Sequence, residues 1–488
     1  MRKIRLLSLL LVTVLVISSC GIITINRKSA ETSGRSGETD GMTEYTYIPL
    51  EYETVPDTDG ESISRNSLDA LDGYDMKGTS VLIAAATECS GMFNAEEGKY
   101  ASSVALRNSM LADKFAADIV TVIQPASQIL KSVANAKKSG DYFADFIVIP
   151  AGSMGEYYKN GYLKNLRSLP YLDLDAECFN YDAMSQMTVG NSVYGAVGFA
   201  NEYVDSYVCL YANKKLLSDA GKEIDYTALY SEEFGWDGLF ELFTGLPEGV
   251  KTLSSSLTKN DAAIHGFSSS GFNFVDTENG YALIEPDEEL DAFAANLKSL
   301  VSQITASAKV KKSAENGKET TVTVEGFDLF ASGLSAFAVG TLGDMEKLGS
   351  CGFEWEVLPF PIYSEGSGYA TPVSKNAPIV AVLEKGTDVD RVGHVLAALF
   401  AASEGYIRDS FLKDAEKRLI TRYTTIDMID LICENPIYDF AVMFGSASTA
   451  LSGATTGCVT SLLKSASPFS VLVTEKREAA EKYLDGLR

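Results

Sequence analysis

The residue types that most often do covalent chemistry are few in this chain and poorly spaced for it. Two histidines in 488 residues disfavour His-based metal sites and catalytic triads. No GxSxG, Walker A or GxGxxG string occurs, and the two SxxK strings at 410–413 and 461–464 lack KTG and SDN companions. The seven cysteines form no CxxC pair, which argues against redox and zinc-ribbon sites. We therefore predict no catalytic residue, no metal and no cofactor.

Carboxylates are abundant, but they indicate no particular site. Asp and Glu number 66 against 41 Lys and Arg, which gives a net charge of −25. A nucleic-acid-binding surface needs clustered Lys and Arg, so a nucleic-acid partner is disfavoured. The acidic residues are too numerous to single out the acid–base pair of a polysaccharide hydrolase.

The N-terminal residues have the pattern of a signal peptide. Basic residues at positions 2, 3 and 5 precede an apolar run at 6–17 that is too short to span a bilayer comfortably. The following ISSCG string at 17–21 resembles a bacterial lipobox, in which the peptidase cuts before a cysteine that is then lipidated. We therefore expect a signal peptide at 1–19, palmitate or a similar lipid on Cys20, and a flexible acidic tether at 20–77. This predicts a lipoprotein held on the extracellular side of the cell membrane.

The rest of the chain alternates between segments typical of strands and of helices. Apolar or β-branched segments at 80–86, 118–123 and 143–149 predict buried strands, and apolar periodicity predicts helices at 103–117 and 126–138. This β-α-β-α-β order implies a parallel sheet, and ligands of such sheets bind beyond the carboxyl ends of the strands. Later segments predict helices at 214–220, 287–309, 392–400 and 474–487, and strands at 337–339 and 354–358.

A series of short strings resembles the extracellular solute-binding proteins of bacterial ABC importers, in particular the carbohydrate-associated type of clostridia and their relatives. LYANKKLL at 210–217, followed by an Ala-Gly pair, is similar to the family's YNKKLLEEAG segment. LKNLRSLPYLDL at 163–174, NSVYG at 191–195 and EVLPFPIY at 356–363 resemble further family segments in the same order. The chain departs from the family at sugar-stacking positions, because Cys178 and Phe179 replace two tryptophans and a TW pair after Trp236 is missing.

The resemblance implies an α/β, two-lobed periplasmic-binding-protein-like fold, in which each lobe is a mostly parallel sheet flanked by helices and hinge strands join the lobes. It implies chain crossings near 196–204, 334–340 and 370–378. Lobe one is expected at 79–197 plus 340–370, and lobe two at 203–335 plus 378–488. The implied function is that of a monomeric binding protein, not an enzyme. It captures a small solute, with a carbohydrate favoured, between the lobes and delivers it to an ABC permease.

A sugar site needs aromatic faces and a few placed hydrogen-bonding groups, which selects ten candidate ligand-binding residues. They are Glu88, Ser90 and Ser153 at strand ends of lobe one, Asn201 and Glu202 in the first crossing, Trp236, Phe272 and Asn273 in lobe two, and Thr341 and Tyr369 beside the later crossings. Trp236 is read equally well as a packing residue, and Phe272 and Asn273 as part of a Gly-rich turn.

Two other functions stay open at this stage. A ligand-binding lipoprotein with the same fold can serve a sensor or another surface protein instead of a permease, and a surface polysaccharide hydrolase is the less favoured alternative. The sequence identifies neither the ligand, nor the pairing of the cysteines, nor the resting arrangement of the lobes.

Overall fold

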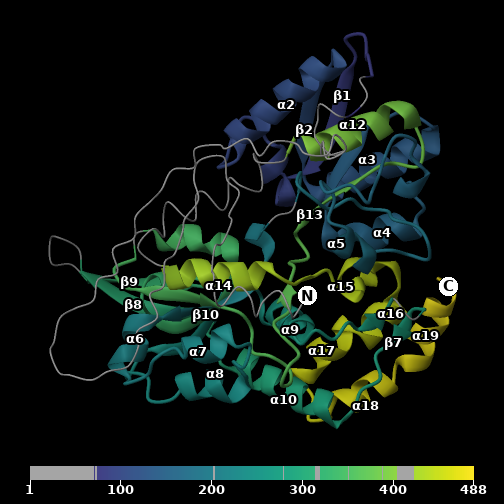
Figure 1. The fold of residues 1–488 in the computed structure, drawn as a ribbon. Helices are drawn as coiled ribbons and strands as arrows, with labels where there is room; N and C mark the ends of the chain where they lie inside the picture. The colour runs from purple at the N-terminus through teal and green to yellow at the C-terminus, as the bar shows by residue number, and fades with distance from the viewer. Residues whose placement is uncertain are drawn as a thin grey trace, which may run out of the picture. The chain divides into compact units, whose positions relative to one another are not determined.

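The protein is described from a computed structural model, which covers residues 71, 74–201, 204–277, 280–313, 319–349, 351–386, 388–403 and 423–487. The predicted signal peptide, Cys20 and most of the predicted tether lie outside these residues. No helix within them is long and apolar enough to cross a membrane. Two four-stranded sheets organise the described chain into two lobes (Figure 1).

The first sheet has the strand order β13-β3-β1-β2. β1 (Ser80–Ala86), β2 (Asp118–Gln124) and β3 (Phe146–Pro150) run parallel, and β13 (Pro378–Ala381) pairs antiparallel with β3. All five residues of β3 are buried, as expected for a strand covered on both faces, whereas edge strand β2 alternates between exposed and half-buried residues. The β-α-β-α-β order predicted from the sequence is therefore present.

Helices and turns surround this first sheet in lobe one. They are α2 (Ala101–Phe115), α3 (Ala126–Ser139), α4 (Met154–Lys159), α5 (Tyr181–Gln186) and α12 (Val389–Ala401), with the 3-10 turns η2 (Thr87–Cys89), η3 (Gly91–Phe93), η4 (Ala151–Ser153) and η5 (Leu166–Ser168). α3 ends where Gly140 adopts the left-handed conformation, which glycine adopts without steric cost.

The second sheet has the order β11-β4-β10-β5 and is mixed. β10 (Ser335–Thr341) is parallel to β5 (Lys251–Ser255) but antiparallel to β4 (Val208–Asn213), and β11 (Trp355–Leu358) is also antiparallel to β4. The prediction of a mostly parallel sheet is therefore wrong for this lobe. The reason is that β4 runs away from the hinge, whereas the other three strands run toward it.

Lobe two carries most of the helices. They are α6 (Lys214–Asp219), α7 (Tyr226–Tyr230), α8 (Trp236–Leu242), α9 (Lys259–Ser268), α10 (Glu288–Ser302), α11 (Asp328–Ala331), α14 (Tyr423–Cys433), α15 (Phe440–Phe444), α16 (Thr449–Ala454), α17 (Thr456–Leu462), α18 (Phe469–Thr474) and α19 (Arg477–Asp485), with η6 (Val204–Ser206), η7 (Leu342–Leu348) and η8 (Gly445–Ala447). Two hairpins complete it, β6 (Val275–Asp276) with β7 (Ala282–Leu283) and β8 (Ser307–Ser313) with β9 (Glu319–Glu325).

The helix predicted at 287–309 is shorter than expected. Asp287 caps α10 by accepting the Leu290 N–H at 2.8 Å, but the helix ends at Ser302. The following residues form strand β8 because they pair along their whole length with β9, whose ETTVTVE sequence is rich in β-branched side chains.

The chain ranges predicted for the two lobes need correction at two strands, at α12, which lies in the range 378–488 but packs on α2 of lobe one, and at η7, which lies in the range 340–370 but packs on β10 of lobe two. β11 lies in the range 340–370 that was assigned to lobe one, yet it pairs with β4 in the second sheet. β13 lies in the range 378–488 that was assigned to lobe two, yet it pairs with β3 in the first sheet. The crossing predicted near 334–340 is absent, because β10 pairs within the second sheet. The short buried sequences WEVL and PIVA fit either sheet, so composition does not decide between them.

The hinge consists of three chain segments that pair with one another. β12 (Thr371–Pro372) is parallel to β14 (Pro436–Ile437), and Val373 forms a bridge with Tyr207. The chain passes from the first sheet to the second between β3 and β4 and again between α12 and α14, and it returns between β11 and β13. The backbone of the first passage, at Tyr207, and that of the return, at Val373, thus pair at the hinge, and β14, which follows α14, pairs with β12 beside them.

Candidate ligand-binding site

The carboxyl ends of strands from both lobes meet the hinge. In lobe one, the last residue of β3, Pro150, pairs with Pro378, where the chain leaves the hinge. In lobe two, the last residue of β10, Thr341, pairs with Val208, where β4 leaves the hinge. Ligands of α/β sheets bind beyond such carboxyl ends. This edge is therefore where the predicted residues of lobe one should act.

The three candidates at the strand ends of lobe one differ in what they offer. Glu88 lies exposed in η2 and accepts the Ala126 backbone N–H at 3.0 Å, at the start of α3, whose N-cap residue is a proline without a side-chain acceptor. Ser90 is 9% exposed at the end of η2. Ser153 is half-buried at the end of η4. Glu88 therefore serves the helix as well as facing solvent.

The candidate residues in the first crossing have a structural task or lie outside the described residues. Asn201 is 1% exposed, its Nδ2 donates to Ala196 O at 2.8 Å and Pro378 O at 2.9 Å, and its Oδ1 accepts from Gly198 N at 3.0 Å. Both amide hydrogens are used, so Asn201 fastens the hinge and has no donor left for a ligand. Glu202 is not among the described residues.

The candidates beside the later crossings are also bound within the protein. Thr341 caps η7 in a capping box with Asp344. Tyr369 is 7% exposed, and its hydroxyl donates to Leu229 O at 3.2 Å. Neither residue lines a described pocket.

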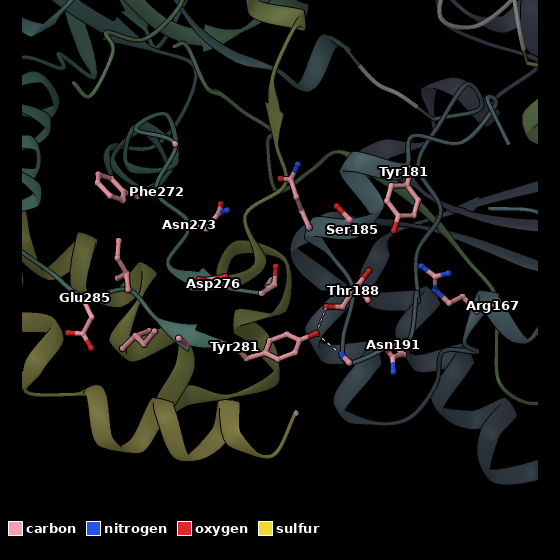
Figure 2. Close-up of a pocket in the computed structure, with 17 residues that line it drawn as sticks. Arg167, Tyr181, Ser185, Thr188, Asn191, Phe272, Asn273, Asp276, Tyr281 and Glu285 are labelled. Atoms are coloured by element: carbon pink, nitrogen blue, oxygen red, sulfur yellow. Dashed lines mark hydrogen bonds between the residues drawn. The ribbon is translucent and has the colours of Figure 1, made fainter. Parts of the chain in front are cut away.

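A pocket of about 930 Å³ is lined by both lobes, and it brings together two of the ten candidates, Phe272 and Asn273 (Figure 2). Lobe one contributes Arg167, Tyr181, Ser185, Gln186, Thr188, Gly190 and Asn191, and lobe two contributes Gly271, Phe272, Asn273, Asp276, Thr277, Tyr281, Ala282, Leu283, Ile284 and Glu285. Its volume lies within the usual range of ligand pockets, about 300–1,000 Å³. We call it the interlobe pocket.

Tyr281 ties the two walls of the interlobe pocket together. Its hydroxyl donates to Thr188 O at 2.8 Å and accepts from Gly190 N at 2.6 Å (Figure 2). Burial raises the pKa of Tyr281, so the hydroxyl keeps its proton at neutral pH. Tyr281 also has a left-handed backbone with φ of 59°, which is unfavourable for a bulky residue and marks a position held by its surroundings.

A second pair of hydrogen bonds joins lobe one to the hinge beside this pocket. The Gln186 side chain donates to Pro436 O at 3.3 Å and accepts from Tyr438 N at 2.8 Å.

Nearby, α4 packs directly on the segment after α15. A Cβ on Gly155 would come within 2.5 Å of Phe444 O, so only glycine allows this approach.

The chemistry of the interlobe pocket suits a polar ligand, and the charged side chains of its lining are Arg167, Asp276 and Glu285. The rings of Tyr181 and Phe272 offer aromatic faces, and Ser185, Asn191 and Asn273 offer hydroxyl and amide groups (Figure 2). Glu285 is already paired with Arg477 at 2.8 Å. No group of three or more potential metal ligands occurs among the described residues. The arrangement can stack and hydrogen-bond a ligand, but it shows no nucleophile beside a base.

A buried carboxylate provides another link across the hinge. Asp205, 5% exposed in η6, pairs with Lys99 and accepts from the Tyr100 hydroxyl at 3.2 Å. Lys99 also pairs with Glu346 of η7 at 2.7 Å. Burial raises the pKa of Asp205, and the Lys99 ammonium opposes this shift. Residues of both lobes thus meet at the first crossing.

Sequence reasoning missed most of the lining of the interlobe pocket. Of the seven lining residues of lobe one, Arg167 and Asn191 lie within the strings at 163–174 and 191–195 and the other five lie between the two strings, so the resemblance indicated the region but not the side chains. No signal in the sequence pointed to Tyr281, whose hydroxyl joins the two walls of the pocket and whose backbone is left-handed. Trp236 lies at the start of α8 and lines a different pocket, within lobe two.

No protein-family model matches the sequence, and no curated protein matches it either. Several solved structures match over most of the chain. They include the GacH receptor of Streptomyces glaucescens, solved unliganded and with acarbose, at 14% identity over 83% of this chain and 98% of that one, with a TM-score of 0.54.

Two further solved structures match this chain at similar identity and coverage. The cyclic α-maltosyl-1,6-maltose binding protein of Arthrobacter globiformis matches at 13% identity over 84% of this chain and 100% of that one, with a TM-score of 0.58. An ABC substrate-binding protein of Listeria monocytogenes, solved with cycloalternan, matches at 13% identity over 83% and 99%, with a TM-score of 0.53. The chain therefore has the two-lobed α/β fold of the solute-binding proteins of ABC transporters.

Proposed function

We propose that this protein is an extracellular solute-binding protein that captures a carbohydrate between its lobes and delivers it to an ABC permease. The observation that carries the proposal is the interlobe pocket, because residues on both sides of a hinge line it. A ligand that touches both walls binds better when the lobes are together, so it shifts their equilibrium without any covalent step.

The character of the lining supports a sugar. Tyr181 and Phe272 offer aromatic faces for the apolar face of a sugar ring, while the surrounding hydroxyl and amide groups suit its hydroxyls. The named ligands of the matched structures, acarbose and cycloalternan among them, favour an oligosaccharide for this chain too. The strand-end residues Glu88, Ser90 and Ser153 stay candidates for contacts at the edge of the site.

We further propose that the chain is anchored to the membrane. The lipobox-like string and the acidic residues after it support a lipid on Cys20 and a tether to about residue 77. Such an anchor holds the binding lobes close to a permease. A sensor in place of the permease would need the same lobes and the same anchor.

A ligand screen tests the proposal. The melting temperature of residues 21–488 is measured with mono- and oligosaccharides and with short peptides. Calorimetry then measures the binding of each ligand that raises it. A ligand at a hundred times its dissociation constant stabilises the fold by about 2.7 kcal/mol, a readily visible shift. A peptide as the only ligand would contradict the carbohydrate assignment, and shortened oligosaccharides after incubation would contradict the binding role.

Variants then locate the site. Tyr181→Ala and Asn273→Ala should each weaken sugar binding at least tenfold, because each removes a group from one wall of the pocket. Tyr171→Ala is the matched control, since Tyr171 is 60% exposed in lobe one and does not line the pocket. Equal affinity in all three variants would move the site away from the interlobe pocket, toward the strand ends.

A further inference from the structure

The charged side chains of the interlobe pocket indicate which class of sugar it takes, so this inference rests on the proposed function. Arg167 comes from lobe one, and Asp276 and Glu285 come from lobe two. Glu285 is already paired with Arg477, which lies outside the lining, at 2.8 Å. Among the described lining residues, Arg167 is therefore the one cation that faces a ligand.

The guanidinium group of Arg167 has no partner within the described chain. The hydrogen bond of Arg167 to a side chain is made by its backbone N–H, and its guanidinium group makes neither a hydrogen bond nor an ion pair there. The other three described arginines, Arg107, Arg391 and Arg477, each donate to a carbonyl or pair with a carboxylate. All five N–H donors of Arg167 are therefore available to a ligand.

The backbone that carries Arg167 is held in place by the neighbouring turn. Asn165 Oδ1 accepts from the backbone N–H groups of Arg167 and Val193, each at 3.1 Å. The backbone N–H of Leu166 donates to Val193 O at 2.8 Å, and the Leu166 side chain is buried. The η5 turn is thus joined to the turn that carries Asn191, and both residues line the wall of lobe one (Figure 2).

The groups around Arg167 on this wall are neutral. Figure 2 shows its guanidinium group pointing toward the side of the pocket on which Tyr181 and Thr188 lie. The hydroxyl of Ser185 and the amide of Asn191 line the same wall. The positive charge of Arg167 is therefore uncompensated here, and its planar pair of donors matches the two oxygens of a carboxylate.

The wall of lobe two suits the hydroxyl groups of the same ligand. Asn273 and Asp276 carry acceptor oxygens, and Phe272 offers a ring face. Asp276 is half-buried in β6, and its charge repels an acid group placed on that side. The two walls therefore favour a ligand whose acid group lies toward lobe one and whose hydroxylated rings lie toward lobe two.

We propose that the interlobe pocket is selective for an acidic oligosaccharide that contains a uronate, and that Arg167 binds the uronate carboxylate through two parallel hydrogen bonds. Closure of the lobes removes water from this pair and so strengthens it. The chain as a whole has a net charge of −25 and repels anions, so an acidic ligand requires a local cation of this kind. Arg167 thus determines the charge of the ligand, and the other lining groups bind its neutral part.

Calorimetry with matched acidic and neutral oligosaccharides tests this selectivity. The acids are trimers of galacturonate, glucuronate and mannuronate, and the neutral partner of each is its methyl ester, which keeps the rings and removes the charge. At least one acid should bind more tightly than its ester by about tenfold or more. Binding of neutral oligosaccharides without binding of any acid would overturn the selectivity and leave the proposed function intact. Binding of no sugar at all would overturn both.

Variants of Arg167 test its role with the acid that binds. Arg167→Gln should weaken binding of the acid by about tenfold more than binding of the ester. Arg167→Lys keeps the charge but loses the planar pair of donors, so its affinity for the acid should lie between those of the wild type and Arg167→Gln. Equal weakening of acid and ester by Arg167→Gln would overturn the role of Arg167.

A matched control separates a local contact from long-range attraction. Lys131→Gln removes the same charge from an exposed position of α3 that does not line the pocket. It should leave the affinity for the acid close to that of the wild type, and a loss equal to that of Arg167→Gln would overturn the contact. The Arg167 side chain is exposed, so the melting temperatures of the ligand-free variants should match that of the wild type.

Discussion

Replacing Tyr281 by phenylalanine should weaken the closure of the lobes on a bound sugar. The substitution keeps the ring but removes the hydroxyl that bonds Thr188 O at 2.8 Å and Gly190 N at 2.6 Å. Each hydrogen bond contributes about 0.5–1.5 kcal/mol net, so the pair contributes about 2 kcal/mol. If both bonds form only when the lobes are together, the apparent affinity for the sugar falls roughly 30-fold, since about 1.4 kcal/mol corresponds to a factor of ten.

Calorimetry with the sugar identified by screening measures this loss, and X-ray scattering measures how far the lobes separate without ligand. Tyr158→Phe is the control, because the Tyr158 ring contacts Tyr194 and Phe444 and no hydrogen bond of its hydroxyl occurs within the described chain. An unchanged affinity in Tyr281→Phe, together with a lower melting temperature, would refute the reasoning. The two bonds would then support the fold whether the lobes are together or apart.

Three further predictions concern the anchor, a buried carboxylate and the hinge. Cys20→Ser should release the protein from cells into the medium, which fractionation and immunoblotting measure; retention on the cells would contradict the lipid anchor. Burial raises the pKa of Asp439 from 3.8 to about 6, so the folded state holds a proton more tightly than the unfolded state. The free energy of unfolding should therefore fall by about 3 kcal/mol as the pH rises from about 4 to above 6. This fall should be absent from urea titrations of Asp439→Asn, and the same fall in the variant would contradict the assignment. Asn201→Ala loses three hydrogen bonds at a buried site, so it should lower the free energy of unfolding by about 2–4 kcal/mol in urea titrations. Asn94→Ala, which removes a cap from an exposed turn, should cost less, and equal losses would contradict the role of Asn201.

Local sequence patterns predicted the elements of lobe one well, because buried strands and amphipathic helices have distinct periods. The strand predicted at 80–86 matches β1, and the helix predicted at 126–138 matches α3 to within one residue. Sheet membership was harder to predict. β11 and β13 are both four-residue strands buried on both faces, so nothing in their own sequences specifies the sheet that they join.

The ligand-binding residues were the least predictable part. Phe272 and Asn273 line the interlobe pocket, but their partners across it come from lobe one, about 80 to 105 residues earlier in the chain. Such pairs depend on how two lobes meet, and local periodicity carries no information about that. Asn201 shows the converse difficulty. Its residue type suggested a ligand contact, whereas its surroundings use both of its amide hydrogens for the backbone.

The hydrogen bonds of Asn201 have a consequence for the axis about which the lobes can turn. They clamp the residues just before the first crossing to β13, so this part of the crossing must move with lobe one as a rigid body. Within the first crossing, the rotation is then confined to the residues between Asn201 and β4, next to the bridge between Tyr207 and Val373. Because this point of rotation lies so close to the second sheet, lobe one extends farther from it than lobe two does. A small torsional change there moves the walls at Arg167 and Asn191 much farther than it moves the hinge itself.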